Sequence, residues 1–157
     1  MPVNNEEFRG ALGRFASSVS VVTSKCSDGE LRAITVSAFS SLSLNPPLIL
    51  ICIDNRSSLV EHLIADCSFA VNILGEDQEI LSRRFASKEP NRFAGVGYKE
   101  GVSGSPLLDH ALATLECKVV HNYAGGDHTI VVGEVEATSV TDSKPLLYFR
   151  GGYAKLA

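Results

Sequence analysis

Two long stretches of alternating apolar and polar residues, joined by a short glycine-bearing connection, constrain the fold of this chain more than any other feature. Residues 113–122 place Leu, Cys and Val on one face with Glu and Lys on the other, and residues 128–139 alternate likewise. Because side chains along a strand point to opposite faces with a period of two, each stretch predicts a long strand. The connection at 123–127 predicts that these strands form an antiparallel hairpin.

Shorter strand patterns surround this hairpin. Strand-forming residues at 18–24 and 31–36 flank an Asp-Gly turn, which predicts a second hairpin. Further strands are predicted at 48–53, 68–74 and 146–149. The first of these is continuously apolar, which predicts a strand covered on both faces. About six or seven strands with mostly short connections predict a mainly β chain, folded as a closed antiparallel barrel with a few short helices.

Three helices are predicted, at residues 6–16, 58–65 and 76–86. The first carries Phe8, Leu12 and Phe15 at helical spacing, so one of its faces is apolar. The second starts with a capping box at residues 58–61. The third has acids in its first turn and arginines in its last, which the helix macrodipole favours. Residues 88–109 show no periodicity, and a loop of that length is often functional.

Length and charge limit the class of protein. The 157 residues correspond to one domain, residues 1–157, with no repeat or linker. The formal net charge is -4 and no basic stripe is present, which argues against nucleic-acid binding. The longest apolar run, residues 46–53, is far shorter than the ~20 residues that span a bilayer, so no membrane association is expected.

The cysteines and the N-terminus bear on location. No secretory signal precedes the domain, and none of the four cysteines belongs to a C-x-x-C pair. Apolar neighbours favour buried free thiols at Cys52, Cys67 and Cys117, rather than bridges or ligands. The histidines have no metal-ligand spacing, so no metal site is predicted. Together these features predict a cytoplasmic protein.

The first of three polar clusters, residues 35–43, is rich in hydroxyl groups and lies where a predicted strand ends. Its hydroxyl and backbone N–H groups could hold the polar edge of a flat heterocycle, while Val36, Phe39 and Leu42 contact its face. The alternative is an ordinary serine-rich turn, which composition alone favours.

The other two clusters are shorter. Residues 54–58 join a strand to a predicted helix N-terminus, where free N–H groups could bind a phosphate with Arg56 as counter-charge. Ser57 or Ser58 could instead only cap the helix. His128 follows a Gly-Gly turn, and it could donate a proton or hydrogen bond to an anionic intermediate. The alternative is a structural or solvated histidine.

Five motifs, in this order along the chain, resemble those of the short-chain flavin reductases, the reductase components of two-component flavin-dependent monooxygenases. They are Thr-x-Ser-x-Phe-x-Ser-x-Ser-x-x-Pro-Pro, Asn-Arg-Ser-Ser, Phe-Ala-Val-Asn-Ile-Leu, Gly-Asp-His-Thr-Ile-x-x-Gly-Glu-Val and Leu-Tyr-Phe-Arg-Gly-Gly-Tyr, within residues 35–153. The resemblance implies an FMN-binding split barrel that forms a homodimer. It also implies hydride transfer from NADH, or less often NADPH, to FMN or FAD, and delivery of reduced flavin to a separate monooxygenase that acts on an aromatic substrate.

The resemblance also implies roles for particular residues. The flavin ring would lie on the segment that contains Thr35, Val36, Ser37, Ala38, Ser41, Leu42 and Ser43. Its ribityl and phosphate portion would meet Asn55, Arg56, Ser57 and Ser58, with Arg84 and Phe85 closing part of the site. His128 would contact the nicotinamide as the catalytic residue, and Arg150 and Tyr153 would lie near the nucleotides.

Other functions on a related barrel stay open at the level of sequence. One is a flavin-binding electron-transfer protein without nicotinamide turnover, another a pyridoxamine-phosphate oxidase-like enzyme, and a third a ligand-binding barrel without redox activity. The motifs do not distinguish FMN from FAD or NADH from NADPH. They also do not distinguish a permanently bound flavin from one that exchanges as a substrate.

Overall fold

The computed structural model describes residues 2–157, which leaves Met1 of the predicted domain outside the description. The chain forms α1 (Asn5–Leu12), β1 (Ser17–Ser18), β2 (Ser20–Lys25), β3 (Leu31–Val36), β4 (Phe39–Ser43), β5 (Leu48–Asp54), the single 3₁₀ turn η1 (Val60–His62), β6 (Ser68–Ile73), α2 (Glu79–Ala86), β7 (Tyr98–Glu100), β8 (Pro106–Leu108), β9 (Ala113–Gly125), β10 (His128–Val140), β11 (Leu146–Phe149) and β12 (Gly152–Lys155). Within residues 2–157, no helix is long and apolar enough to cross a membrane.

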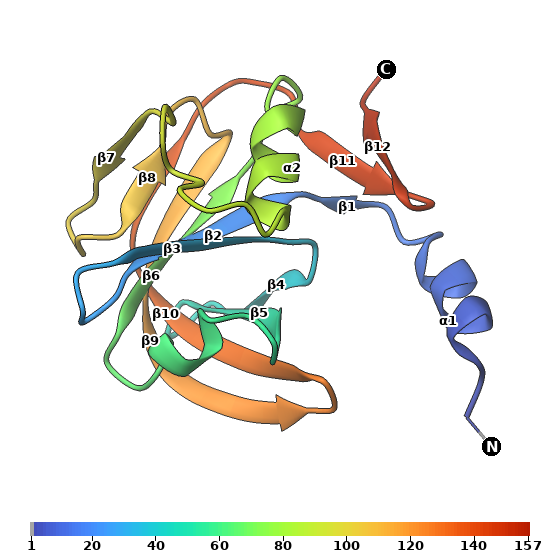
Figure 1. Cartoon of the computed structure of the whole chain (residues 1–157), viewed down its shortest axis with the longest axis horizontal. Helices are drawn as coiled ribbons and strands as arrows, with labels where there is room; N and C mark the ends of the chain where they lie inside the picture. The colour runs from blue at the N-terminus through green and yellow to red at the C-terminus, as the bar shows by residue number, and fades with distance from the viewer. Residues whose placement is uncertain (1) are drawn as a thin grey trace.

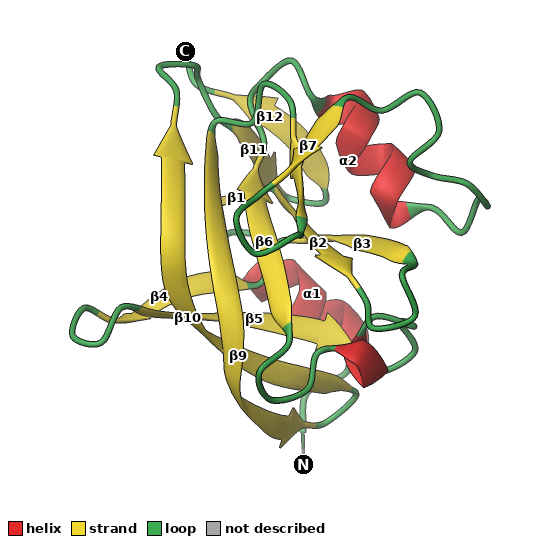
Figure 2. Cartoon of the chain, turned by 90° about the vertical axis from the view of Figure 1, so that its left-hand side faces the viewer, coloured by secondary structure: helices red, strands yellow, loops and turns green. Residues whose placement is uncertain are grey.

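Seven strands form one antiparallel sheet in the order β3-β2-β6-β9-β10-β5-β4. The sheet curls on itself, as Figures 1 and 2 show, until β3 on one side approaches β5 on the other. These two strands do not pair with each other, so the barrel is split between β3 and β5. The predicted mainly β split barrel with a few short helices is confirmed. A small sheet, β1-β11-β12, and the β7-β8 hairpin flank the barrel.

The barrel interior is filled by the apolar residues that alternate along each strand. Ile49, Ile51 and Ile53 of β5 point inward and are buried. The prediction that this strand is covered on both faces is wrong for the single chain, because the alternate residues of β5 are only half-buried. Phe69 of β6 is fully buried, and it lies over Gly133, where a side-chain Cβ would meet its ring at 2.6 Å.

The long hairpin of β9 and β10 is confirmed, with both strands longer than predicted. They meet at the two-residue turn Gly126-Asp127, where Gly126 has a φ of 67°. One prediction about its faces is wrong: Glu116 is buried rather than on a polar face. Its carboxylate accepts hydrogen bonds from the Ser103 N–H at 3.0 Å and the Ser103 hydroxyl at 2.9 Å, which satisfy it in the interior.

The helices differ from prediction more than the strands do. The helix expected at 58–65 is absent: a single turn, η1, replaces it, and Ser57 Oγ accepts the Leu59 N–H where a capping box was expected. α1 ends at Leu12 rather than residue 16, and α2 begins at Glu79 rather than residue 76. Four apolar residues between 58 and 65 suggested a helix, but the burial of Leu59 and Leu63 against the core needs only one turn.

Three further segments differ from the secondary structure predicted from the sequence. Residues 39–43, expected to follow the end of a strand, are themselves β4, paired with β5. The segment at 88–109 is not a structureless loop, because it contains the β7-β8 hairpin. Leu108 N–H donates to the buried Asn72 side chain at 2.9 Å, which attaches this hairpin to the barrel. β12 was not predicted, and it pairs with β11 across a turn at Arg150-Gly151. Cys52, Cys67 and Cys117 are free thiols as predicted, but only Cys117 of these three is buried, and Cys52 and Cys67 are half-buried.

Candidate functional site

An open cleft of about 600 Å³ lies in the split between β3 and β5. Its base is formed by Ala33 and Ile34 of β3. One side, here called the β5 wall, consists of Asp54, Arg56, Ser57 and Ser58. The other side, here called the α2 wall, consists of Phe85, Ala86, Ser87, Lys88, Glu89 and Arg92. The volume lies within the range of about 300–1,000 Å³ that small-ligand sites occupy.

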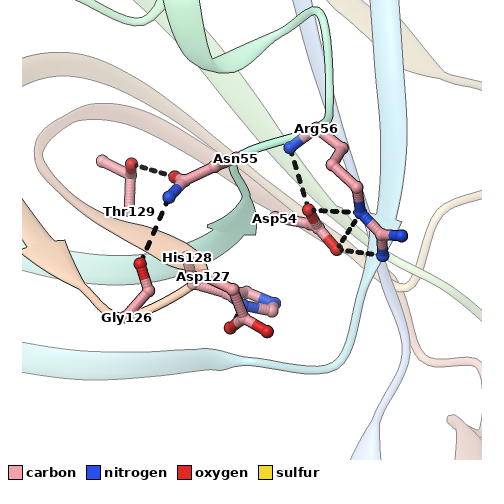
Figure 3. A network of polar contacts seen from close by, with 7 residues as sticks. All are labelled: Asp54, Asn55, Arg56, Gly126, Asp127, His128 and Thr129. Carbon is pink, nitrogen blue, oxygen red and sulfur yellow. Dashed lines mark hydrogen bonds and ion pairs between the residues drawn. The ribbon is translucent and has the colours of Figure 1, made fainter.

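The β5 wall is attached to the β9-β10 hairpin. Figure 3 shows that the Asn55 side chain lies between Thr129 and Gly126. The Asn55 N–H donates to the Asp127 carbonyl at 2.9 Å, so both backbone and side chain join the end of β5 to the turn. Because β10 belongs to the barrel, the residues that follow Asn55 start from a fixed point beside the cleft.

Asp54 and Arg56 form an ion pair on this wall. Arg56 Nη2 lies 2.7 Å from Asp54 Oδ2, and Arg56 Nε lies 3.1 Å from Asp54 Oδ1 (Figure 3). Hydrogen bonds from the Arg56 side chain and backbone N–H hold the pKa of Asp54 well below its usual range, and the carboxylate in turn raises the pKa of Arg56. The Arg56 side chain is 89% exposed. An exposed pair of this kind contributes little stability, so an anionic ligand can take over the guanidinium at small cost.

His128 lies at the same corner of the barrel, at the start of β10. Its Cα is the register partner of Asp54, and its Nδ1 lies 2.7 Å from Asp127 Oδ1. The ring is 42% exposed. The contact with Asp127 orients the ring and leaves Nε2 available for another partner.

The segment of the first polar cluster is divided between two places. Ile34 lines the cleft, whereas Thr35, Val36, Ser37 and Ala38, which continue from it to the start of β4, do not. The Thr35 hydroxyl donates to the Ser82 carbonyl of α2 at 2.7 Å, and Val36 is buried, whereas Ser37 and Ala38 are exposed. Ser41, Leu42 and Ser43 lie further along β4, at the edge of the sheet, and do not line the cleft.

The remaining predicted site residues are dispersed. Arg84 turns away from the cleft, and its guanidinium donates to the carbonyls of Arg92 and Ala94. Phe85 is fully buried and packs beneath the surface of the cleft. The Tyr153 hydroxyl lies 2.7 Å from Ser82 Oγ, on α2. Arg150 lies in the β11-β12 turn, where its N–H donates to the Gly13 carbonyl.

Sequence reasoning missed most of the α2 wall. Ser87, Lys88, Glu89 and Arg92 all line the cleft, together with Ala33 and Ile34 of β3. The one signal that pointed toward them was the aperiodic stretch that begins at Lys88. This signal located the region but no particular residue. The chain bends here and lies against β3, and such a long-range contact has no pattern in the local sequence.

The composition of the cleft suits a flat, anionic ligand. Three cationic side chains, Arg56, Lys88 and Arg92, line it together with two carboxylates, Asp54 and Glu89. Apolar contacts come from Ile34 and Ala33 at its base. Within residues 2–157, no cluster of three or more His, Cys, Asp or Glu side chains could hold a metal ion. The residues present therefore fit a phosphorylated aromatic cofactor, since the cleft offers both cationic and apolar side chains.

Fold and cleft together define the class: a split barrel with an open cleft between β3 and β5, where the sheet does not close. Residues 12–157 match the family described as "Flavin reductase like domain", and the chain belongs to this family. The family resemblance that the sequence motifs indicated is thereby confirmed.

Similar proteins support this assignment over nearly the whole chain. The reductase component of 4-hydroxyphenylacetate 3-monooxygenase from Thermus thermophilus is 41% identical, over 96% of this chain and 96% of that protein. A flavin reductase of Pseudomonas putida is 34% identical, over 99% and 92%. Among solved structures, the NADH:FAD oxidoreductase of Streptomyces globisporus C-1027, in complex with NAD and FAD fragments, gives a TM-score of 0.92 at 36% identity. That alignment covers 100% of this chain and 97% of the neighbour.

Proposed function

We propose that this protein is an NAD(P)H-dependent flavin reductase that supplies reduced flavin to a separate monooxygenase. Its membership of the flavin reductase-like family supports this function, as do relatives that are reductase components of monooxygenases. A Rhodococcus relative described as an NADH-dependent flavin reductase is 40% identical over 94% of this chain. The structural observation that carries the proposal is the cleft between β3 and β5, with the exposed Arg56 guanidinium on its wall.

In this proposal the cleft holds FMN or FAD. Arg56 binds the phosphate after exchanging its contact with Asp54, and Ser57 and Ser58 offer hydroxyl groups to the ribityl chain. Ile34 lies beside the ring, and the exposed residues Ser37 and Ala38 follow it along the chain. The flavin, when bound, supplies the chemistry by accepting a hydride from the nicotinamide. The protein has to orient the two rings against each other, and no nucleophile or metal is required.

We assign His128 to the nicotinamide side of the site. Its ring is oriented by Asp127 and lies on β10 next to the Asp54 register position, so Nε2 can donate a hydrogen bond near the β5 wall. Arg150 and Tyr153 belong to a different part of the molecule, beside α1 and α2. Any contact between these two residues and a nucleotide would therefore lie outside the cleft described here.

A homodimer is part of the proposal. α1 buries none of its residues, and it projects from the barrel in Figure 1. Phe8, Leu12 and Phe15 are 56%, 50% and 74% exposed. A helix of eight residues is too short to be stable without packing partners. A second copy that covers this apolar face explains its composition, and light scattering of the purified protein measures the resulting mass. The four free thiols fit a reducing compartment, and we place the protein in the cytoplasm.

Anaerobic turnover tests the function directly. The purified protein is mixed with NADH or NADPH and with FMN, FAD or riboflavin under argon, and the loss of nicotinamide absorbance is followed. A reductase oxidises at least one nicotinamide, and only when flavin is present. Flavin binding with no oxidation of either nicotinamide would instead make the protein an electron-transfer or storage barrel. Turnover of pyridoxamine phosphate would place it with the oxidases.

A further inference from the structure

Arg92 makes an unusual set of contacts for a residue of an otherwise polar surface segment. Its guanidinium donates to three backbone carbonyls: Phe85 at 2.6 Å, Ser87 at 3.1 Å and Ala33 at 2.7 Å. It also lies over the Phe85 ring, 5.9 Å from the ring centroid. The side chain is half-buried, and burial lowers the pKa of Arg92. The planar guanidinium group spreads five donors over three nitrogens and so reaches carbonyls on both α2 and β3, whereas the three donors of a lysine ammonium group all sit on one nitrogen.

The three carbonyls belong to the two sides of one gap. Phe85 and Ser87 lie at the C-terminal end of α2, where helix carbonyls have no partner within the helix. Ala33 lies on β3, the edge strand of the barrel, and is buried. Arg92 therefore satisfies carbonyls that the helix end and the strand edge both leave free, and it joins the α2 wall of the cleft to the base.

The same contacts change the charge that the cleft presents. A helix C-terminus carries a partial negative charge, and the end of α2 forms part of the cleft lining. Without a cation against it, this end would repel an anionic ligand. Arg92 lies on these carbonyls, and it therefore offsets the negative helix end where a phosphorylated ligand would approach.

We infer that Arg92 is a positioning residue of the cleft: by joining Phe85 and Ser87 of the α2 wall to Ala33 of β3, it fixes the position of the α2 wall against the base of the cleft that receives the flavin. The inference rests on the proposed function for the identity of the ligand. It assigns Arg92 no contact with the reacting atoms. Arg92 acts through the backbone of the wall, so its loss should affect flavin affinity and leave the nicotinamide step largely unchanged.

The test compares Arg92→Lys with wild type, and uses Arg32→Lys as the matched control. Arg32 lies next to Ala33 on β3, but its guanidinium binds Asp28 outside the cleft. Lysine keeps the positive charge at both positions and removes the planar guanidinium group. For Arg92→Lys we expect the dissociation constants of FMN and riboflavin, measured by flavin fluorescence, to rise together by roughly tenfold. The KM for NADH and the kcat at saturating flavin should stay within about twofold of wild type.

A second readout needs no flavin. Amide hydrogen exchange in residues 85–92 of the flavin-free protein should be faster in Arg92→Lys by about tenfold or more, and unchanged in Arg32→Lys. Unchanged flavin affinity and exchange in Arg92→Lys would overturn the inference, even if wild-type turnover supports the proposed function. A loss confined to FMN would also overturn it, because Arg92 would then be a direct phosphate ligand. Arg92→Met removes the positive charge as well as the guanidinium group. If that variant does not fold, the Arg92→Lys result alone decides the inference.

Discussion

The side chain of Asn55 accepts a hydrogen bond from Thr129 through its Oδ1, at 2.6 Å, and so attaches the end of β5 to β10. The same side chain donates from Nδ2 to the Gly126 carbonyl at 3.3 Å. One residue thus spans the turn of the long hairpin and fixes the point from which Arg56, Ser57 and Ser58 extend along the cleft (Figure 3). The start of the β5 wall is therefore attached to the barrel through Asn55.

Asn55→Asp tests this attachment by changing one contact and one charge. Aspartate still accepts the Thr129 hydroxyl, but it cannot donate to the Gly126 carbonyl, and it adds a negative charge beside the proposed phosphate position. We expect FMN affinity to fall by about tenfold, with riboflavin affinity changed much less, because only FMN carries a phosphate. Asn55→Ala serves as the control, since it removes both hydrogen bonds without adding charge and should weaken both flavins alike. Equal losses for FMN and riboflavin in Asn55→Asp would contradict the placement of the phosphate.

Arg56→Ala tests the counter-charge itself. The variant removes the only guanidinium on the β5 wall, so FMN should bind about tenfold to a hundredfold more weakly while riboflavin affinity is retained. Asp54→Asn is the complementary change: it releases Arg56 from its ion pair, and FMN should bind a few-fold more tightly. Both effects should shrink as salt is added. If Arg56→Ala leaves the ratio of FMN to riboflavin affinity unchanged, the phosphate lies elsewhere.

The strands of this fold were predictable because their signal is local. The alternation in β9 and β10 and the Asp-Gly turn before β3 predict two hairpins without reference to the rest of the chain, although not the register shifts between Val132 and Gly133 and between Val135 and Ala137. The expected helix at 58–65 failed for the opposite reason. Its apolar residues are placed by contact with the core, and Leu59 and Leu63 reach that core from a single 3₁₀ turn. Apolar periodicity over eight residues does not distinguish a helix from a single 3₁₀ turn.

Only part of the site was predictable from the sequence. The cleft lies between strands that do not pair, and these strands come together only when the whole sheet curls into a barrel. The consecutive motif Asn55 to Ser58 located most of the β5 wall, although Asn55 itself does not line the cleft. The α2 wall depends on where Arg92 finds carbonyl partners, one of which is Ala33, 59 residues away in sequence. No local pattern encodes that contact. Glu116 was misplaced for the same reason, since its partner Ser103 belongs to a loop rather than to a neighbouring strand.

Gly133→Ala tests how tightly the barrel is packed where β10 crosses β6. A Cβ at this position would lie 2.6 Å from Phe69 Cζ and 3.0 Å from the Cys117 Cβ, both in the core. We expect the free energy of unfolding to fall by about 1–3 kcal/mol, because a fully buried ring has little room to move. Gly125→Ala on β9 is the control: its nearest neighbours, on Ile130, lie at 3.6 Å, so urea unfolding should show little change. A Gly133→Ala variant as stable as wild type would mean that Phe69 can repack freely.

Cys117 predicts a loss of stability in alkali. Burial raises the pKa of this thiol from 9.0 to about 12. The folded protein therefore holds the proton more tightly than the unfolded chain, and the stability this contributes is present below pH 9.0 and declines between pH 9.0 and about 12. We expect the free energy of unfolding to fall more steeply over that interval in wild type than in Cys117→Ala. If the free energy of unfolding changes equally with pH in both proteins, the pKa of the thiol is the same in the folded and the unfolded chain.

His128→Ala distinguishes a nicotinamide contact from a structural histidine. The ring is oriented by Asp127 and makes no hydrogen bond to Asp54 or Arg56, so its loss should leave flavin binding nearly intact. The KM for NADH should rise by about tenfold, since one hydrogen bond to the nicotinamide portion is lost. Asp127→Asn is the matched variant, because it keeps the histidine and weakens only its orientation, and a smaller rise in KM is expected. A fall in flavin affinity equal to the rise in KM would show that His128 supports the β5 wall rather than the coenzyme.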